Sequence, residues 1–270
     1  MNIDPEFVEK VLTRFIKDEW GRAGFRKAVL GLSGGLDSAV CAGLASRALG
    51  PRNVLGLILP MGRAFPEEVA DARDVAATFG IRTKTIDISP QIEAYFSAHP
   101  TTNRVLKGNK MARERMSILY DHSAREKALV LGTSNKTELL IGYGTLHGDM
   151  ASAFNPIGDL YKTQVRTLAR RLGVPDRCLS KRPTAGLWPG QTDEDEIGLT
   201  YETIDRILYE LVDLRKSRTE VAASGLNPAD IDRVVSMMKK SEFKRKLPPI
   251  AKISFRTIGH DFLYAHDRED

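Results

Sequence analysis

The residues with the clearest chemical role form the segment Ser33-Gly34-Gly35-Leu36-Asp37-Ser38, which joins an apolar stretch to a stretch rich in Ala and Leu. Two glycines permit a tight turn that points backbone N–H groups into one cavity. The start of the following helix adds partial positive charge, which favours a phosphate group. Asp37 would repel phosphate unless a cation lay between them, and Mg²⁺ is the natural candidate. The segment therefore predicts a cradle for magnesium pyrophosphate.

A simpler interpretation is a glycine turn in which Asp37 caps the helix, and for a bare pair of glycines it would be preferred. Two glycines, two serines and an aspartate between a buried strand and a helix favour the functional interpretation. The chain contains no GxxxxGK[ST] loop, and the segment is not a GxGxxG dinucleotide fingerprint.

Strand and helix patterns alternate on both sides of this segment. Short apolar runs predict strands at 28–32, 54–59, 81–88 and 128–131. Helical spacing predicts helices at 7–16, 36–49, 67–79, 110–127 and 163–172, with a further helix opening at Ser89-Pro90. Such alternation predicts an α/β fold, a doubly wound parallel sheet with helices on both faces. We expect five strands, with the first and fourth adjacent and the site across their carboxyl ends.

The last third of the chain has a different pattern. Residues 181–196 lack periodicity, contain two prolines and two glycines, and end in an acidic cluster, as in many active-site lids. Additional helices are predicted near 201–216 and 227–240. A basic C-terminal tail follows at 241–270, extended from Lys246 because of Pro248-Pro249. No clean boundary divides the chain, so we expect a single domain over 1–270.

Composition limits the function classes. The 270 residues carry a formal charge of +5, and the excess lies in the stretch 239–256, which is best interpreted as a solvated basic face. Neither an aromatic stacking platform nor zinc-finger spacing supports nucleic-acid binding. No apolar run reaches membrane-spanning length. Cys41 and Cys178 form no CxxC and lack a base partner in sequence, so we expect structural thiols in a cytoplasmic protein.

The SGGxDS spelling resembles that of the pyrophosphate-loop ATPases, which cleave ATP between the α- and β-phosphates and serve several functions. Later segments resemble the ammonia-dependent NAD synthetases and extend the resemblance over nearly the whole chain. These segments are KMARER (110–115), LGTSNKTE (131–138), GD (148–149), NPIGDLYK (155–162), KRPTAGLW (181–188), QTDE (191–194) and FKR (243–245). The resemblance implies the adenine nucleotide alpha hydrolase type of the predicted fold.

The resemblance also implies residue roles. It implies magnesium on Asp37 and Glu138, and catalytic roles for Asp37, Asp149 and Lys162, with Asp149 positioning the nicotinate carboxylate or the ammonia. ATP would be bound as co-substrate by Gly31, Leu32, Ser33, Gly34, Gly35, Leu36, Asp37, Ser38, Thr133, Lys162 and Thr184. Deamido-NAD would be bound at Arg113, Leu146, Ala153, Phe243 and Lys244.

The chain departs from the family pattern at three of these positions. Leu146 and Ala153 stand where many members carry lysine and aspartate, and Phe243 stands where some carry histidine. The stretch 147–153 is closer to the synthetase portion of the glutamine-dependent enzymes, which carry an added amidase domain. A separate amidase that supplies ammonia is therefore left open as a partner. The resemblance also implies a homodimer. The motifs and apolar runs described above indicate neither nucleic acid nor membrane as a partner.

The reaction implied is the ATP- and magnesium-dependent amidation of deamido-NAD with ammonia to give NAD, AMP and pyrophosphate through an acyl-adenylate. An alternative is a tRNA-modifying or other pyrophosphate-loop ATPase that adenylates a different acceptor, although no added RNA-binding region or reactive cysteine pair is seen. A third is a module that senses adenine nucleotides without turnover. The paired acids Asp37 and Glu138 argue against the third, because binding alone needs no clamp for a divalent metal.

Overall fold

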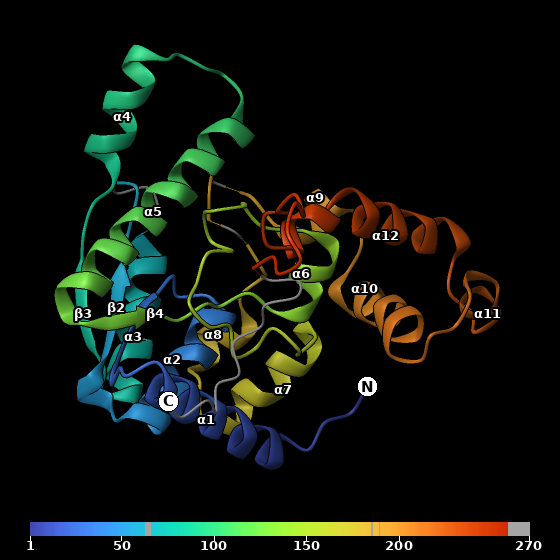
Figure 1. Ribbon diagram of the computed structural model, residues 1–270, viewed down its shortest axis with the longest axis horizontal. Coiled ribbons are helices and arrows are strands. Elements are labelled where there is room, and N and C mark those ends of the chain that lie inside the picture. The colour runs from blue at the N-terminus through green and yellow to red at the C-terminus, as the bar shows by residue number, and fades with distance from the viewer. Residues whose placement is uncertain (63–65, 185, 189, 259–270) are drawn as a thin grey trace.

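A computed structural model describes residues 1–62, 66–184, 186–188 and 190–258 (Figure 1). The strands are β1 (Lys27–Gly31), β2 (Val54–Ile58), β3 (Arg82–Thr85) and β4 (Ala128–Val130). The first helices are α1 (Pro5–Arg22), α2 (Leu36–Leu49), α3 (Pro66–Phe79), α4 (Ser89–Ala98), α5 (Arg104–Glu126), α6 (Lys136–Ile141) and α7 (Lys162–Leu172). They are followed by α8 (Asp176–Ser180), α9 (Asp193–Ile197), α10 (Tyr201–Leu208), α11 (Arg218–Ala223) and α12 (Pro228–Lys240). Short turns of helix are η1 (Pro51–Asn53), the π-helical η2 (Tyr209–Asp213) and η3 (Glu242–Arg245).

The strands form one parallel sheet in the order β3-β2-β1-β4. The chain crosses from β1 outward to β3 and then returns to the other side of β1, so strand order reverses between β1 and β4. The prediction that the first and fourth strands are neighbours is confirmed. A crevice at this reversal is the usual ligand position in an open α/β sheet.

The prediction of five strands is wrong, because the sheet holds four in the described part of the chain. Beyond β4 the pairing shrinks to a single parallel bridge between Leu131 and Phe154. Its hydrogen bonds run from Ala153 N to Val130 O at 2.9 Å and from Gly132 N to Phe154 O at 2.8 Å. Pro156 follows two residues after Phe154 and has no N–H to donate, so the ladder does not grow into a fifth strand.

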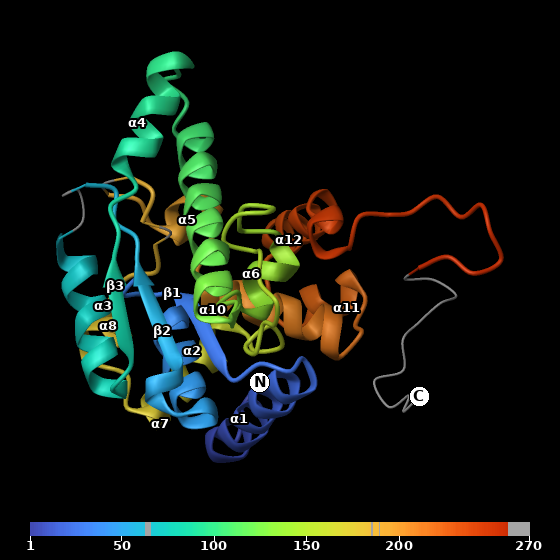
Figure 2. The ribbon, with the colours of Figure 1, turned by 60° about the vertical axis from the view of Figure 1, so that its left-hand side comes forward.

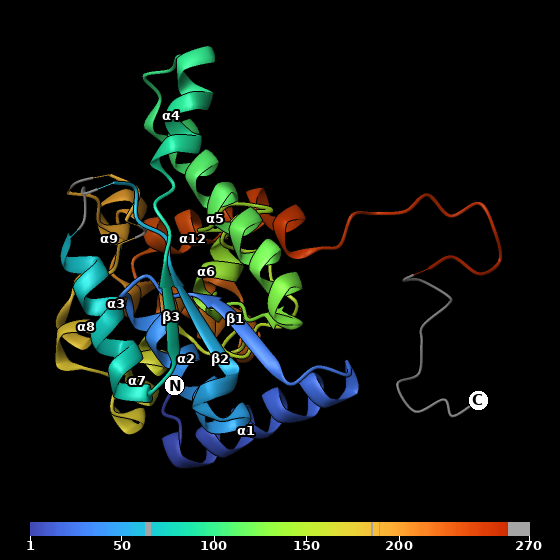
Figure 3. The ribbon, with the colours of Figure 1, turned by 90° about the vertical axis from the view of Figure 1, so that its left-hand side faces the viewer.

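Helices cover both faces of the sheet, as the alternating pattern predicts. One core joins β1 and β2 to α1, α2, α3 and α7, and its largest buried side chain is Trp20. Trp20 Nε1 donates to Lys27 O at 2.8 Å, which fixes α1 against the start of β1. The other core places α4 and α5 against the opposite face. Figures 2 and 3 show α5 lying along the sheet and projecting with α4 beyond its edge.

The C-terminal helices form a third cluster beside the sheet, in which α6, α10, α11 and α12 share an apolar core (Figure 1). The tail leaves this cluster as extended chain, as the Pro248-Pro249 pair predicts (Figure 3). Residues 259–270 of the predicted tail lie outside the described residues. None of the described helices is long and apolar enough to cross a membrane.

Two helices near the site differ from the sequence-based expectation. α5 begins at Arg104, six residues earlier than predicted, because the Asn103 side chain accepts from Val105 N at 2.9 Å and caps the helix. α6 was not predicted. It is short, and it is held at its start by a capping box in which Asn135 and Glu138 exchange hydrogen bonds. This cap fixes Glu138 at the mouth of the sheet.

Candidate active site

A cavity of about 530 Å³ opens across the carboxyl ends of β1, β2 and β4, where strand order reverses. The loop after β1 forms one wall, and α6, α7 and the start of α9 contribute to the opposite wall. The segment predicted as a lid also lines it, through Lys181, Arg182, Pro183, Thr184, Gly186, Leu187, Trp188 and Gln191. Positions 185 and 189 of that segment lie outside the described residues.

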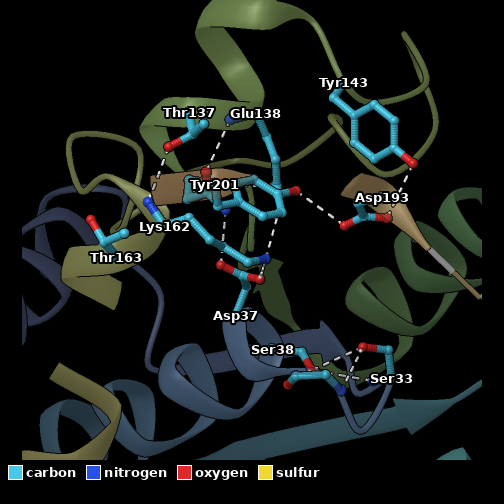
Figure 4. Close-up of polar contacts among 12 residues, drawn as sticks. Ser33, Asp37, Ser38, Thr137, Glu138, Tyr143, Lys162, Thr163, Asp193 and Tyr201 are labelled. Carbon is cyan, nitrogen blue, oxygen red and sulfur yellow. Dashed lines mark hydrogen bonds and ion pairs between the residues drawn. The ribbon is translucent and has the colours of Figure 1, made fainter. Parts of the chain in front are cut away.

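The loop after β1 has the turn predicted for a phosphate cradle. Ser33 Oγ accepts from Gly35 N at 3.2 Å and lies 3.1 Å from Ser38 Oγ, which also accepts from Ser33 N at 3.3 Å. These bonds hold both hydroxyl groups at the N-terminus of α2, as Figure 4 shows. Apart from Gly34, every residue from Gly31 to Ser38 lines the cavity.

Gly34 lies at the closest approach of this loop to α3. Its φ is +77°, and a Cβ atom there would lie 2.6 Å from Glu68 O and 2.9 Å from Asp71 Cβ. Both the backbone angle and the space therefore require glycine.

The centre of the site is a buried lysine between two carboxylates (Figure 4). Lys162 Nζ is paired with Asp37 Oδ2 and lies 3.2 Å from Glu138 Oε1. The Lys162 side chain is 6% exposed, whereas those of Asp37 and Glu138 are 15% and 18% exposed. All three side chains line the cavity, and the two carboxylates are more accessible than the lysine. The structure thus brings together Asp37, Glu138 and Lys162, which were predicted to serve catalysis or metal binding.

Neighbouring polar groups fix this arrangement. Lys162 N donates to Thr137 Oγ1 at 3.0 Å, and Thr137 Oγ1 donates to the fully buried Asp205. Asp205 also accepts from Thr163 N at 2.8 Å, so it anchors the start of α7 to α6. Asn135 Nδ2 donates to Asp37 Oδ1 at 3.0 Å. The cap of α6 therefore binds both carboxylates of the site.

Burial and charge shift the proton affinities of this group. Burial raises the pKa of Glu138 to about 8, against the lowering effect of Lys162 and with the help of Asp37. Burial alone would lower the pKa of Lys162, but the charges of Asp37 and Glu138 outweigh it and raise that pKa. Lys162 is therefore a fixed cation at neutral pH, and Glu138 is the group whose protonation responds to its surroundings.

Two tyrosines and a third acid, not predicted as site residues, complete this wall. The Lys162 ammonium lies 5.1 Å from the centre of the Tyr201 ring. The hydroxyl groups of Tyr201 and Tyr143 donate to Asp193 at 3.0 and 3.1 Å (Figure 4). Asp193 N donates to Pro183 O at 3.0 Å, which ties the start of α9 to the first part of the predicted lid. Asp193 belongs to one of the family-like segments, but no sequence spacing relates it to either tyrosine.

Asp149 and Lys244 also line the cavity, outside the cluster formed by Asp37, Glu138 and Lys162. Asp149 accepts from Thr145 N at 2.7 Å. It is accessible from the cavity but surrounded by protein, and this desolvation raises the pKa of its carboxyl group. Lys244 Nζ donates to Gly142 O at 2.8 Å and to Gly144 O at 2.7 Å, so its ammonium group is held by backbone carbonyls.

Other predicted residues are divided between the cavity and the outer surface. Thr133 and Thr184, which were predicted to contact ATP, line the cavity. Arg113, Leu146, Ala153 and Phe243 do not line it. Arg113 Nε instead donates to Leu146 O at 3.2 Å, and Phe243 is 60% exposed on η3. Of the five positions expected to bind deamido-NAD, only Lys244 faces this cavity.

Comparison with known proteins gives a consistent picture. A family model described as NAD synthase matches residues 8–248. The NH(3)-dependent NAD(+) synthetase of Trichlorobacter lovleyi is 51% identical over 267 residues, covering 99% of this chain and 98% of that protein. The structure of NMN synthetase from Francisella tularensis has a TM-score of 0.83 at 35% identity, covering 93% of this chain and all of that one. An NH3-dependent NAD synthetase structure from Campylobacter jejuni has a TM-score of 0.80 at 35% identity, with the same coverage.

The cradle predicts a sharp contrast between two glycines with positive φ. Gly34→Ala should abolish nucleotide binding and lower the free energy of unfolding by about 2–3 kcal/mol. The added Cβ atom would clash with α3, and the positive φ would strain the backbone. Gly173, at the end of α7, has φ +79°, and a Cβ atom added there would meet nothing within 4 Å, so Gly173→Ala should cost only about 1 kcal/mol and leave binding intact. Urea denaturation and ATP titration measure both; equal losses of binding would contradict this account of the cradle.

Lys162→Met should leave two buried carboxylates without a counter-charge. We expect the free energy of unfolding to fall by about 3–5 kcal/mol at pH 8. The pKa of Glu138 is about 8 with Lys162 present and lowering it, so removal of Lys162 should raise it further. A carboxyl group with a raised pKa contributes stability that is complete below its unfolded value and lost as pH rises through the folded value. The variant should therefore regain stability as pH is lowered from 9 to 6 in urea denaturation.

The control for this variant is Lys10→Met, which removes an exposed lysine paired with Glu6 on α1. It should change stability little at any pH. A stability loss for Lys162→Met that is constant across this pH range would show that the carboxylates do not need the ammonium group.

Proposed function

Because the chain belongs to the NAD synthase family, we propose that it is a ligase that makes NAD from deamido-NAD and ammonia, with ATP cleaved to AMP and pyrophosphate. The observation that carries this conclusion is the cluster of Asp37, Lys162 and Glu138 beside the phosphate cradle after β1. A carboxylate reacts with ammonia only after activation, because hydroxide is a poor leaving group. The site contains the groups that activation by ATP requires.

The chemistry divides into two steps. The nicotinate carboxylate oxygen attacks the α-phosphorus of ATP, and the bond to pyrophosphate breaks, so that the leaving group takes the electron pair. Ammonia then attacks the acyl carbon of the adenylate and AMP leaves. The protein needs no covalent nucleophile: it contributes positioning and charge neutralisation, which dominate in transfers of this kind.

Each residue of the cluster has a role in the first step. The N–H groups and hydroxyls of the cradle hold the pyrophosphate portion of ATP, which α2 favours through its N-terminal charge. Lys162 neutralises charge that develops on the leaving pyrophosphate. Thr184, on the lid, closes over the same phosphates. The lid tied to Tyr143 and Tyr201 through Asp193 keeps water from the adenylate.

Magnesium fits the donor set of this site. Asp37 and Glu138 offer two carboxylates with accessible edges, and Mg²⁺ commonly takes one or two carboxylates together with phosphate oxygens and water. Among the described residues no group of three or more His, Cys, Asp or Glu side chains is arranged to hold an ion by itself. The metal would therefore be held jointly with the nucleotide, and it would supply positive charge to the phosphate oxygens.

The part of the site near Asp149 and Lys244, here called the acceptor side because deamido-NAD and ammonia would meet there, is less enclosed. Asp149 and Lys244 suit a place where ammonia meets the acyl group, since a carboxylate can orient ammonia and take up its proton. Four of the expected deamido-NAD positions lie outside the cavity. A second subunit would be one way to make them part of a closed site, which supports a homodimer. The chain is proposed to act as one domain over 1–270, because Asp205 and Lys162 join the C-terminal helices to the sheet.

Two further proposals concern the cellular location of the protein and its source of ammonia. Cys41 and Cys178 are both free and buried, which supports a reducing cytoplasmic location. Burial raises the pKa of the Cys178 thiol to about 11, so neither thiol is poised for catalysis. An amidase partner that supplies ammonia is a separate proposal, tested by the nitrogen donor the protein accepts.

The direct test supplies ATP, Mg²⁺ and deamido-NAD to the purified protein, with ammonium or glutamine in parallel. NAD should form with ammonium, together with equimolar AMP and pyrophosphate. The likeness to an NMN synthetase structure makes nicotinic acid mononucleotide a second acceptor to assay. A higher kcat/KM for the mononucleotide would move the assignment to that acceptor, and no amide from either acceptor would overturn it.

Asp149→Asn tests the acceptor side separately. If Asp149 orients ammonia and takes up its proton, kcat should fall about 100-fold while the KM for ATP changes little. Asp232→Asn is the control, since Asp232 is an exposed acid of α12 paired with Arg218 at 3.0 Å. Unchanged turnover of Asp149→Asn at subsaturating ammonium would remove this residue from the site.

A further inference from the structure

Arg115 of α5 lines the cavity beside the end of β2. Ala112 lies three residues before Arg115 and Leu119 lies four after it, and both line the cavity together with Met116, so one face of α5 forms this wall. Arg113 lies on another face and bonds Leu146 outside the cavity. The sequence motif around these residues was assigned to deamido-NAD through Arg113, whereas the arginine that reaches the cavity is Arg115.

The bonding of Arg115 differs from that of the other cations in the cavity. These cations are Arg115, Lys162, Arg166, Lys181, Arg182 and Lys244. Lys162 has two carboxylate partners, Lys181 lies 3.2 Å from Asp71, and Arg166 lies 3.0 Å from Glu202. Lys244 is bound by two carbonyl oxygens, and Arg182 is exposed.

Arg115 has a single protein acceptor among the described residues. Its Nε donates to Leu59 O at 3.0 Å, and no carboxylate there lies within 4.0 Å of its guanidinium group. Burial lowers the pKa of Arg115, and the charges of Glu68 and Asp149 oppose this from a longer distance. Arg115 is partly buried in the cavity wall, and a cation without a counter-charge there favours an anion from outside the protein.

The geometry of the guanidinium group limits what that anion is. With Nε bonded to Leu59 O, the two terminal nitrogens remain as a planar pair of donors. Such a pair matches two oxygens of one phosphate group. An anion without a second oxygen in the same plane would bind only one of the two terminal nitrogens.

The position of Arg115 within the cavity indicates which phosphate group of ATP it would contact. The cradle after β1 suits the β- and γ-phosphates of ATP, so the AMP portion extends from it across the neighbouring strand ends. The end of β2 and the first turn of α3 offer an apolar wall in Leu57, Leu59 and Val69. Arg115 is anchored on Leu59 O of that wall, and the charge of Asp149 on the acceptor side acts on its guanidinium group. The α-phosphoryl group suits this part of the cavity, because it links the nucleoside to the pyrophosphate and receives the nicotinate oxygen.

We propose that Arg115 binds the α-phosphoryl group of ATP and keeps it through the acyl-adenylate to AMP. This rests on the proposed function and adds to it a division of roles between two cations. Lys162 and the cradle hold the pyrophosphate that leaves. Arg115 holds the phosphoryl group that stays, stabilises negative charge on its non-bridging oxygens during attack and orients it for in-line displacement.

The test separates adenylation from amidation. Exchange of labelled pyrophosphate into ATP is measured with deamido-NAD and without ammonia, which reports only the first step. Binding of α,β-methylene-ATP with Mg²⁺ is measured by calorimetry. The variants are Arg115→Met and Arg115→Lys. Arg125→Met is the matched control, because Arg125 lies on the same helix, is exposed and pairs only with Asp121 at 2.7 Å among the described residues.

Arg115→Met should lower kcat/KM for exchange about 100-fold, as the removal of a donor to a developing oxyanion does. Arg115→Lys keeps the charge but loses the planar pair of donors, and it should lose about tenfold. Both variants should leave the KM for deamido-NAD within about twofold of the wild type, because the planar donor pair contacts only the nucleotide. Arg125→Met should match the wild type in every measurement.

Several outcomes would overturn the proposal. Exchange by Arg115→Met at the wild-type rate would show that the arginine acts on no reacting group. A raised KM for deamido-NAD with unchanged binding of α,β-methylene-ATP would place the anion on the other substrate. If Arg115→Met does not fold, Arg115→Lys carries the test, and full exchange activity with an unchanged melting temperature would refute the proposal. If the wild type makes no NAD, only the proposed function fails, because analogue binding still reports on Arg115.

Discussion

The positive charge of Lys162 between Asp37 and Glu138 is the interaction on which the rest of the site depends. The three residues come from α7, α2 and α6, and Lys162 lies 125 positions from Asp37 in the chain. Asp37 and Glu138 are partly buried and both lie beside the Lys162 ammonium group, so they would repel each other without it. The pairing therefore joins the phosphate cradle to the C-terminal helices. The same carboxylates suit a metal bound to nucleotide. The negative charge of Asp37 and Glu138 would therefore be compensated by Lys162 and by that metal together.

The polar groups around this centre explain why the C-terminal helices pack where they do. Asp205 of α10 is fully buried, yet it bonds Thr137 and the backbone of Thr163, so α10 fixes both segments that deliver Glu138 and Lys162. Asp193 binds two tyrosines on one side and the lid backbone on the other. A buried acid that is fully bonded costs little and orients its donors strongly. The lid and Lys162 thus belong to one network.

Sequence reasoning succeeded where the signal was local. The turn from Ser33 to Ser38 follows from its glycines and serines, and the adjacency of β1 and β4 follows from two polar loops at strand ends. It failed where several distant segments meet. Tyr143, Tyr201 and Asp193 share no spacing, and Arg115 differs from Arg113 only by the face of α5 it occupies. The start of α5 was missed because its first turns are mostly polar. The fifth strand was lost to a proline that ends its pairing after one bridge.

The fate of one oxygen atom tests the central claim, that this site joins the nicotinate carboxylate to the α-phosphate before ammonia arrives. Deamido-NAD labelled with ¹⁸O in the carboxylate is converted with ATP and ammonium, and the phosphorus products are examined by mass spectrometry. The account predicts one ¹⁸O atom in AMP for each NAD formed and none in pyrophosphate. Label in inorganic phosphate, or its absence from AMP, would show that activation takes place at another phosphorus atom and would contradict the assignment of the cradle, Lys162 and Arg115.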